Sequence, residues 1–150
     1  MSHDTYLIAL RMLARRELSE AQIRQRLGRR GESRESIDEA VDRLKSARSI
    51  DDERVAGAIA RTHAAGRNRG RRRVLQQLEA AGIDKSIASR AVDQVFQDLD
   101  PDALLTASLE KRLRGRDRIT DDREFQRLFR YLSAQGFDSD RILAHPRRLQ

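Results

Sequence analysis

The residues of this sequence with the clearest chemistry are its arginines. No carboxylate occurs between Glu53 and Glu79, and the 25 residues between them carry seven arginines. A guanidinium group binds phosphate or carboxylate oxygens through paired N–H donors. We therefore interpret the segment as a binding site for an anionic partner, against the alternative of a basic surface exposed to solvent with no ligand. Five of the seven arginines flank Gly70, and these are Arg67, Arg69, Arg71, Arg72 and Arg73.

A helix is predicted to begin beside Gly70, with Val74 and Leu78 on its apolar side. The N-terminus of a helix exposes N–H groups and the positive end of the helix dipole, and both favour phosphate oxygens. We therefore expect these N–H groups to contact the anion together with the arginines.

Two further arginine clusters occur at comparable places in the chain, and we expect all three to form a basic strip. Which arginines share one face is left open by the sequence. The first of these clusters is Arg24, Arg26, Arg29, Arg30 and Arg34, and the second is Arg112, Arg114, Arg116 and Arg118.

The carboxylates and histidines have simpler explanations than catalysis. Asp51 and Asp52 could serve metal or acid–base chemistry, but acidic residues are also expected in the first turn of a helix. The three histidines are far apart in sequence and are expected at the surface, and the chain has no cysteine. Phosphate-binding loops and nucleophile motifs are absent from the sequence. We expect no enzyme activity, no catalytic residue, no metal site and no cofactor.

Helices must position these arginines, because apolar residues recur at three- and four-residue spacing along the whole chain. Ser19 is predicted to cap the second helix, Asp51 or Asp52 the fourth, and Pro101 is suited to a first helical turn. The sequence therefore predicts an all-α fold.

Three segments align when Gly31, Gly82 and Gly136 are superposed as helix ends. Four positions around each glycine then carry apolar residues in all three segments. We predict three tandem three-helix repeats, at residues 1–49, 50–100 and 101–150, which stack as an elongated, curved solenoid. The aligned sets are Ile23, Val74 and Leu128; Leu27, Leu78 and Leu132; Ile37, Ala88 and Ile142; and Leu44, Val95 and Leu149.

Composition favours a polyanion or an acidic protein surface as the partner. The net charge is +7, charged residues make up 37% of the chain, and aromatic residues make up only 4%. Contacts to a nucleic-acid backbone are therefore expected in preference to base stacking. No apolar run is long enough to span a membrane, and no signal peptide is evident at the start. We expect a cytoplasmic protein with no membrane partner.

Four blocks of the sequence, in order, resemble the RecX family of bacterial regulatory proteins, which modulate the recombinase RecA. The most recognisable block is residues 50–56, with a hydrophobic residue, two aspartates, a charged pair, a bulky apolar residue and alanine. The resemblance covers roughly residues 5–144. The other blocks are residues 6–19 with Ile23, Leu27 and Gly31; residues 70–74 with Leu78, Gly82 and Ile83; and residues 130–132 with Gly136 and Phe137.

The resemblance implies a protein that binds RecA and its single-stranded DNA filament. It implies inhibition of filament extension, ATP hydrolysis and strand exchange, and so modulation of recombination, DNA repair and the SOS response. We also expect contacts to free DNA through its backbone, and a monomer. Two alternatives stay open, a DNA-binding regulator that uses one unit as a helix-turn-helix, and a helical protein–protein adaptor.

Overall fold

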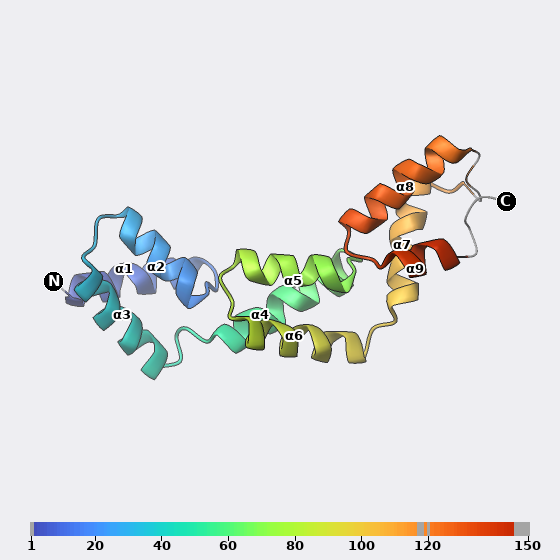
Figure 1. Cartoon of the computed structure of the whole chain (residues 1–150). Coiled ribbons are helices and arrows are strands. Elements are labelled where there is room, and N and C mark those ends of the chain that lie inside the picture. The colour runs from blue at the N-terminus through green and yellow to red at the C-terminus, as the bar shows by residue number, and fades with distance from the viewer. Residues whose placement is uncertain (1, 117–118, 120, 146–150) are drawn as a thin grey trace. The chain divides into compact units, whose positions relative to one another are not determined.

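The computed structural model describes residues 2–116, 119 and 121–145, and the side chains from Asp4 onward within those ranges. Every regular element in this part of the chain is helical, as Figure 1 shows, which confirms the predicted all-α fold. A π-helical turn, η1, extends the fourth helix and was not predicted. The elements are α1 Ser2–Arg15, α2 Glu20–Arg29, α3 Arg34–Ser46, α4 Asp52–Arg61, η1 Thr62–Gly66, α5 Arg71–Ala80, α6 Lys85–Gln97, α7 Pro101–Leu113, α8 Asp122–Ala134 and α9 Ser139–Ala144.

The helices begin where the sequence places capping residues. Ser19 forms a capping box with Gln22 at the start of α2, as predicted. Asp51 caps α4, because its Oδ1 atom accepts hydrogen bonds from the backbone N–H groups of Glu53 and Arg54. Pro101 opens α7. The capping role expected for the acidic residues is therefore confirmed at Asp51.

The three aligned glycines follow α2, α5 and α8, as predicted. Gly31, Gly82 and Gly136 have φ angles of +86°, +74° and +97°. A side chain is unfavourable in this left-handed conformation, so glycine at this position ends a helix at low cost.

The described helices belong to two compact units. Unit 1 comprises residues 1–56 and 78–88, and unit 2 comprises residues 57–77 and 89–150. Helices α4, α5 and α6 each have residues in both units. The predicted repeats instead keep each helix whole, so their boundaries near residues 49 and 100 stay a prediction.

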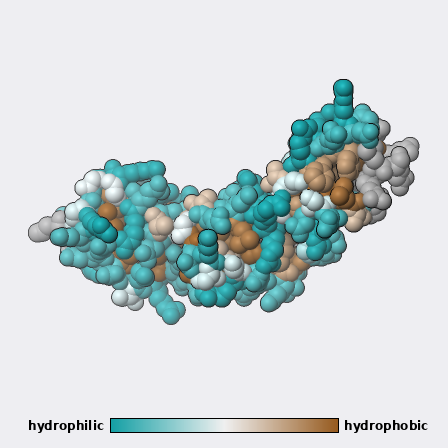
Figure 2. Space-filling view, viewed as in Figure 1, coloured by the Kyte–Doolittle hydropathy of each residue, from teal (hydrophilic) through white to brown (hydrophobic). Residues whose placement is uncertain are grey.

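The core of unit 1 lies where α1 packs against α3 and α2. Figure 2 shows mostly hydrophilic side chains on the visible face, as expected for helices that each bury one side. The Ser19 side chain donates a buried 2.5 Å hydrogen bond to the carbonyl of Ala81, and so joins the α2 start to the turn after α5. The core residues are Ala9, Leu18, Ile23, Leu27, Ile37, Val41, Leu44 and Ile50.

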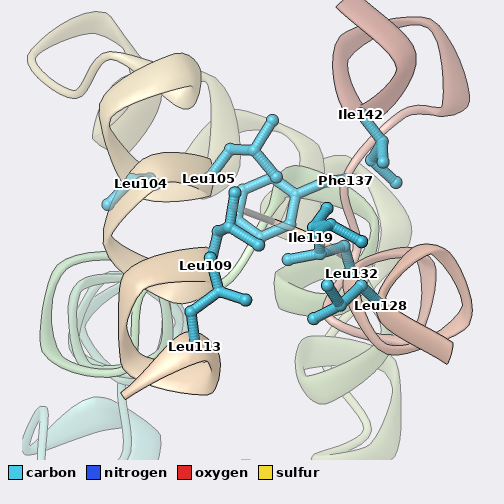
Figure 3. Packing of buried hydrophobic residues seen from close by; sticks show 9 residues of the cluster. All are labelled: Leu104, Leu105, Leu109, Leu113, Ile119, Leu128, Leu132, Phe137 and Ile142. Atoms are coloured by element: carbon cyan, nitrogen blue, oxygen red, sulfur yellow. The ribbon is translucent and has the colours of Figure 1, made fainter. Parts of the chain in front are cut away.

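The main core of unit 2 lies among α7, α8 and α9. Figure 3 shows leucines from α7 facing those of α8, with Phe137 between the helices. Phe137 is the first residue after Gly136, so the turn that ends α8 also supplies a central core side chain. The other core residues are Leu104, Leu105, Leu109, Leu113, Ile119, Leu128, Leu132 and Ile142.

Nearly all the aligned apolar residues that the structure describes are buried. The first three aligned sets are buried in all three segments. In the last set Leu44 is buried and Val95 is half-buried, while Leu149 lies outside the described residues.

Replacing Leu27, Leu78 or Leu132 with alanine should each lower the free energy of unfolding by about 2–5 kcal/mol. Each of the three side chains is at most 3% exposed, so each substitution leaves a cavity. Denaturant unfolding followed by circular dichroism measures the effect. Leu143→Ala is the matched control, because Leu143 is 43% exposed. Near-neutral effects at two of the three core leucines would contradict the alignment.

Candidate nucleic-acid interface

The N-terminus of α5 is covered by the turn that follows α8, within unit 2. The Gly70 N–H group donates to the carbonyl of Gln135 at 2.8 Å, and the Arg72 N–H group donates to that of Gly136 at 3.3 Å. The prediction that these N–H groups are exposed for an anion is therefore wrong at Gly70 and Arg72. Carbonyls of the same unit occupy them instead.

The two segments touch through Gly70 and Gly136, which leave no room for a side chain. A Cβ atom on Gly70 would lie 2.5 Å from the Gly136 carbonyl oxygen. A Cβ atom on Gly136 would lie 2.6 Å from the Cβ of Arg73 and 2.8 Å from the Gly70 oxygen. Real Cβ contacts are longer than this, so the backbones approach closely only because both residues are glycine.

Two of the five arginines around Gly70 bind carbonyl or carboxylate oxygens of the protein. The Arg72 Nη2 atom donates to the Ser133 carbonyl at 2.7 Å, near the C-terminus of α8, where the Gly136 N–H group also donates to this carbonyl at 3.0 Å. Arg71 forms an ion pair with Asp93 of α6. These two guanidinium groups therefore support the local structure.

The other three arginines gather around His63 of η1. The Arg69 Nη1 atom lies 2.6 Å from His63 Nδ1, and the Arg69 N–H group donates to the His63 carbonyl at 3.1 Å. Arg67 is exposed. The Nε atom of Arg73 is buried and has no hydrogen-bond partner among the described residues. We call His63, Arg67, Arg69 and Arg73 the His63 cluster.

The charges of this cluster repel one another. Burial and the positive charges of Arg69, Arg67 and Arg73 lower the pKa of His63. Burial and the charges of Arg73 and Arg67 also lower the pKa of the Arg69 guanidinium. An anion would relieve this repulsion, so the cluster favours an anionic ligand.

A second arginine surface lies in unit 1, along a groove between α1 and α2. The cavity has a volume of about 670 Å³. None of its arginines forms an ion pair with a described carboxylate. We call it the α1–α2 groove, and its lining residues are Ile8, Met12, Arg11, Arg15, Arg16, Arg26, Arg29 and Arg30.

The groove brings together Arg26, Arg29 and Arg30 of the predicted cluster, but neither Arg24 nor Arg34 lines it. Arg24 instead contacts Glu20 at 3.0 Å and Asp38 at 2.6 Å. Sequence reasoning missed the three arginines of the groove that precede α2. The four-residue spacing of Arg11 and Arg15 could have indicated them, because it places both side chains on one side of α1.

The third predicted cluster is largely engaged within unit 2. The Arg112 guanidinium lies over the Tyr131 ring, 4.6 Å from its centroid. Arg116 forms an ion pair with Glu124. Arg114 ends α7 in a left-handed conformation, with φ at 53°. Arg118 lies outside the described residues.

Asp52 and His145 form hydrogen-bond contacts within the protein. Asp52, at the start of α4, accepts a 2.9 Å hydrogen bond from the Glu20 N–H group of α2 through its Oδ1 atom, and burial raises its pKa. His145 is only 8% exposed and lies 2.9 Å from the Thr106 hydroxyl, so the expected surface position is wrong there. It lies beside the core leucines of α7 and α8. The side chain of His3 is outside the described part.

Among the described residues, no group of three or more histidine or acidic residues is arranged to hold a metal ion. None of the helices that the structure describes is both long and apolar enough to cross a membrane.

Comparison with known proteins establishes the family of this chain. Residues 6–44 match the family model of the RecX first three-helix domain, and residues 51–92 match that of the second. The regulatory protein RecX of Syntrophotalea carbinolica is 34% identical over 137 residues, which cover 91% of this chain and 90% of that protein. This chain belongs to the RecX family.

Further RecX proteins extend the comparison to a second sequence and to a solved structure. The regulatory protein RecX of Halorhodospira halophila is 31% identical over 91% of this chain and 82% of its own length. The crystal structure of RecX from Lactobacillus salivarius has a TM-score of 0.79 at 20% identity, covering 94% of this chain and 91% of that one. The solved structure shows the shared RecX fold. Membership in this regulatory family fits a regulator of RecA.

Proposed function

We propose that this RecX-family protein binds RecA and the filament that RecA forms on single-stranded DNA. It inhibits filament extension, ATP hydrolysis and strand exchange, and so modulates recombination and DNA repair. The observation that carries the proposal is the α1–α2 groove, in which six arginines without carboxylate partners in the described structure line one cavity.

Phosphate oxygens are the ligands that this groove fits best. Each arginine that neutralises a phosphate releases a counterion, so several together give affinity that does not depend on base sequence. The aliphatic side chains of Ile8 and Met12 also line the groove, and aromatic rings do not. Tyr6 is covered by the Arg43 guanidinium at 3.8 Å, and Phe137 is buried. This arrangement supports backbone contacts over base stacking.

The predicted binding residues divide by what each side chain contacts. Arg26, Arg29 and Arg30 stay in the proposed interface of unit 1, and Arg67, Arg69 and Arg73 stay in that of unit 2. Arg24, Arg71 and Arg72 have protein partners, so we propose that they maintain the local structure beside the interface. Carboxylates of RecA are the other anions that the guanidinium groups of the interface can bind.

ATP hydrolysis by the cognate RecA on single-stranded DNA tests the proposal. Substoichiometric amounts of this protein should reduce the hydrolysis rate, because each bound molecule affects more than one RecA subunit in a growing filament. Hydrolysis unchanged at equimolar protein would contradict it.

Two binding measurements separate the proposal from its alternatives. A helix-turn-helix regulator would prefer a particular duplex sequence over single-stranded DNA. An adaptor would bind its partner equally well after the groove arginines are replaced. Binding to single-stranded oligonucleotides of unrelated sequence with similar affinity, lost on replacing those arginines, supports the proposed function.

A further inference from the structure

We propose that the His63 cluster is a phosphodiester site that takes up one proton when it binds its ligand. Arg69 turns from His63 Nδ1 to a phosphate oxygen, and the freed imidazole is then protonated. The choice of ligand rests on the proposed function, whereas the proton uptake rests on the contacts among these residues.

The free cluster holds His63 in its neutral form. An arginine side chain has only donors, so the 2.6 Å contact requires Nδ1 to accept a hydrogen bond from Arg69. The ring proton must therefore be on Nε2. A second hydrogen bond, from the Arg69 N–H group to the His63 carbonyl, keeps the two residues together.

The charges of three arginines act on His63. Arg67 and Arg69 lie in the segment after η1, and Arg73 lies on α5. Tyr131 of α8 interacts electrostatically with Arg69 and raises its pKa, against the larger effects that lower it. The charges of the three arginines make imidazolium unfavourable and lower the pKa of His63, in addition to the effect of burial. One phosphodiester would neutralise part of this positive charge, and so make the imidazolium less unfavourable.

The ligand competes with His63 for the Arg69 guanidinium. A charge-assisted hydrogen bond from arginine to phosphate is stronger than one to a neutral imidazole. Arg73 Nε, which is buried without a partner, is a further donor close to Arg69. When Arg69 turns away, the Nδ1 lone pair takes one proton from solvent, and no covalent bond other than N–H is formed.

The binding of a fluorescent oligo(dT) at pH 8 and pH 6, at constant ionic strength, tests the inference. A phosphodiester keeps one negative charge over this range, whereas inorganic phosphate itself titrates. We expect tighter binding at pH 6, by up to about tenfold for each unit by which the ligand raises the pKa of His63. Proton NMR of the imidazole should show that rise directly.

His63→Gln separates protonation from packing. The glutamine oxygen accepts a hydrogen bond from Arg69 but cannot become cationic. This variant should lose the gain at pH 6, so the ratio of its affinities at pH 6 and pH 8 should fall to about one, whatever its affinity at pH 8. His3→Gln is the matched control and should keep the gain.

The outcomes distinguish the inference from the proposed function. Equal affinity at both pH values, an unchanged or lowered pKa of His63 with oligo(dT), or a His63→Gln variant that keeps the pH dependence would each overturn the inference. The proposed function would stand in those cases if RecA is still inhibited. No binding at either pH also overturns the inference, and the RecA hydrolysis assay then decides the proposed function.

Discussion

Replacing Gly136 with alanine should lower the free energy of unfolding by about 2–5 kcal/mol, as much as replacing a core leucine. The φ angle of +97° alone costs an L residue about 1–2 kcal/mol. The added Cβ would also meet the Arg73 Cβ and the Gly70 oxygen at 2.6 and 2.8 Å. Overpacking of this kind costs about 1–3 kcal/mol more, and here backbone atoms must move to relieve it.

Gly31→Ala is the matched control for this substitution. Gly31 has a similar φ of +86°, but a Cβ atom there meets nothing within 4 Å. Only the conformational cost of about 1–2 kcal/mol is expected. Denaturant unfolding of both variants measures the difference, and equal losses would show that the contact between Gly70 and Gly136 contributes nothing.

Replacing Arg11, Arg15, Arg26 and Arg29 together with glutamine should produce the largest loss of binding. If each side chain contacts one phosphate of single-stranded DNA, the salt slope of binding should shrink by about 0.7 per contact, or roughly three units. At physiological salt this corresponds to roughly a hundredfold weaker binding. Surface substitutions without ion pairs have small effects on folding, so circular dichroism should be unchanged.

A matched control removes the same charge from arginines that have carboxylate partners. Arg24, Arg54, Arg71 and Arg141 each form an ion pair with a described aspartate or glutamate. Their combined replacement with glutamine should change the salt slope much less, at a small cost in stability. Equal losses of binding in the two variants would show that only the net charge of the protein matters. The α1–α2 groove would then not be part of the interface.

The elements of this fold could be predicted because their signals are local. Ser19 caps the turn that it begins, and Gly31 adopts a positive φ at the end of its own helix. The spacing of Leu27, Leu78 and Leu132 from the three glycines identifies buried positions without any long-range contact. Local signals fix where helices start and stop, and which side of each is buried.

The candidate site was harder to predict because its contacts join distant residues. Nothing near Gly70 in sequence shows that Gly136 covers the α5 N-terminus, so its N–H groups were wrongly expected to be free. The same holds for Arg24, whose partner Asp38 lies on the next helix. His145 looks like a surface residue until α9 brings it against Thr106.

During synthesis on the ribosome, Ser19 is made long before Ala81, whose carbonyl accepts its hydrogen bond. Unit 1 needs residues 78–88, so its first 56 residues cannot complete it when they emerge. At about 5–20 residues per second, residues 57–88 follow over roughly 2–6 s. During that delay the Ser19 hydroxyl and the α2 surface at Ala21, which later receives Gly82, lack their final partners. The nascent chain therefore reaches its native N-terminal structure late, after part of the next unit has already been made.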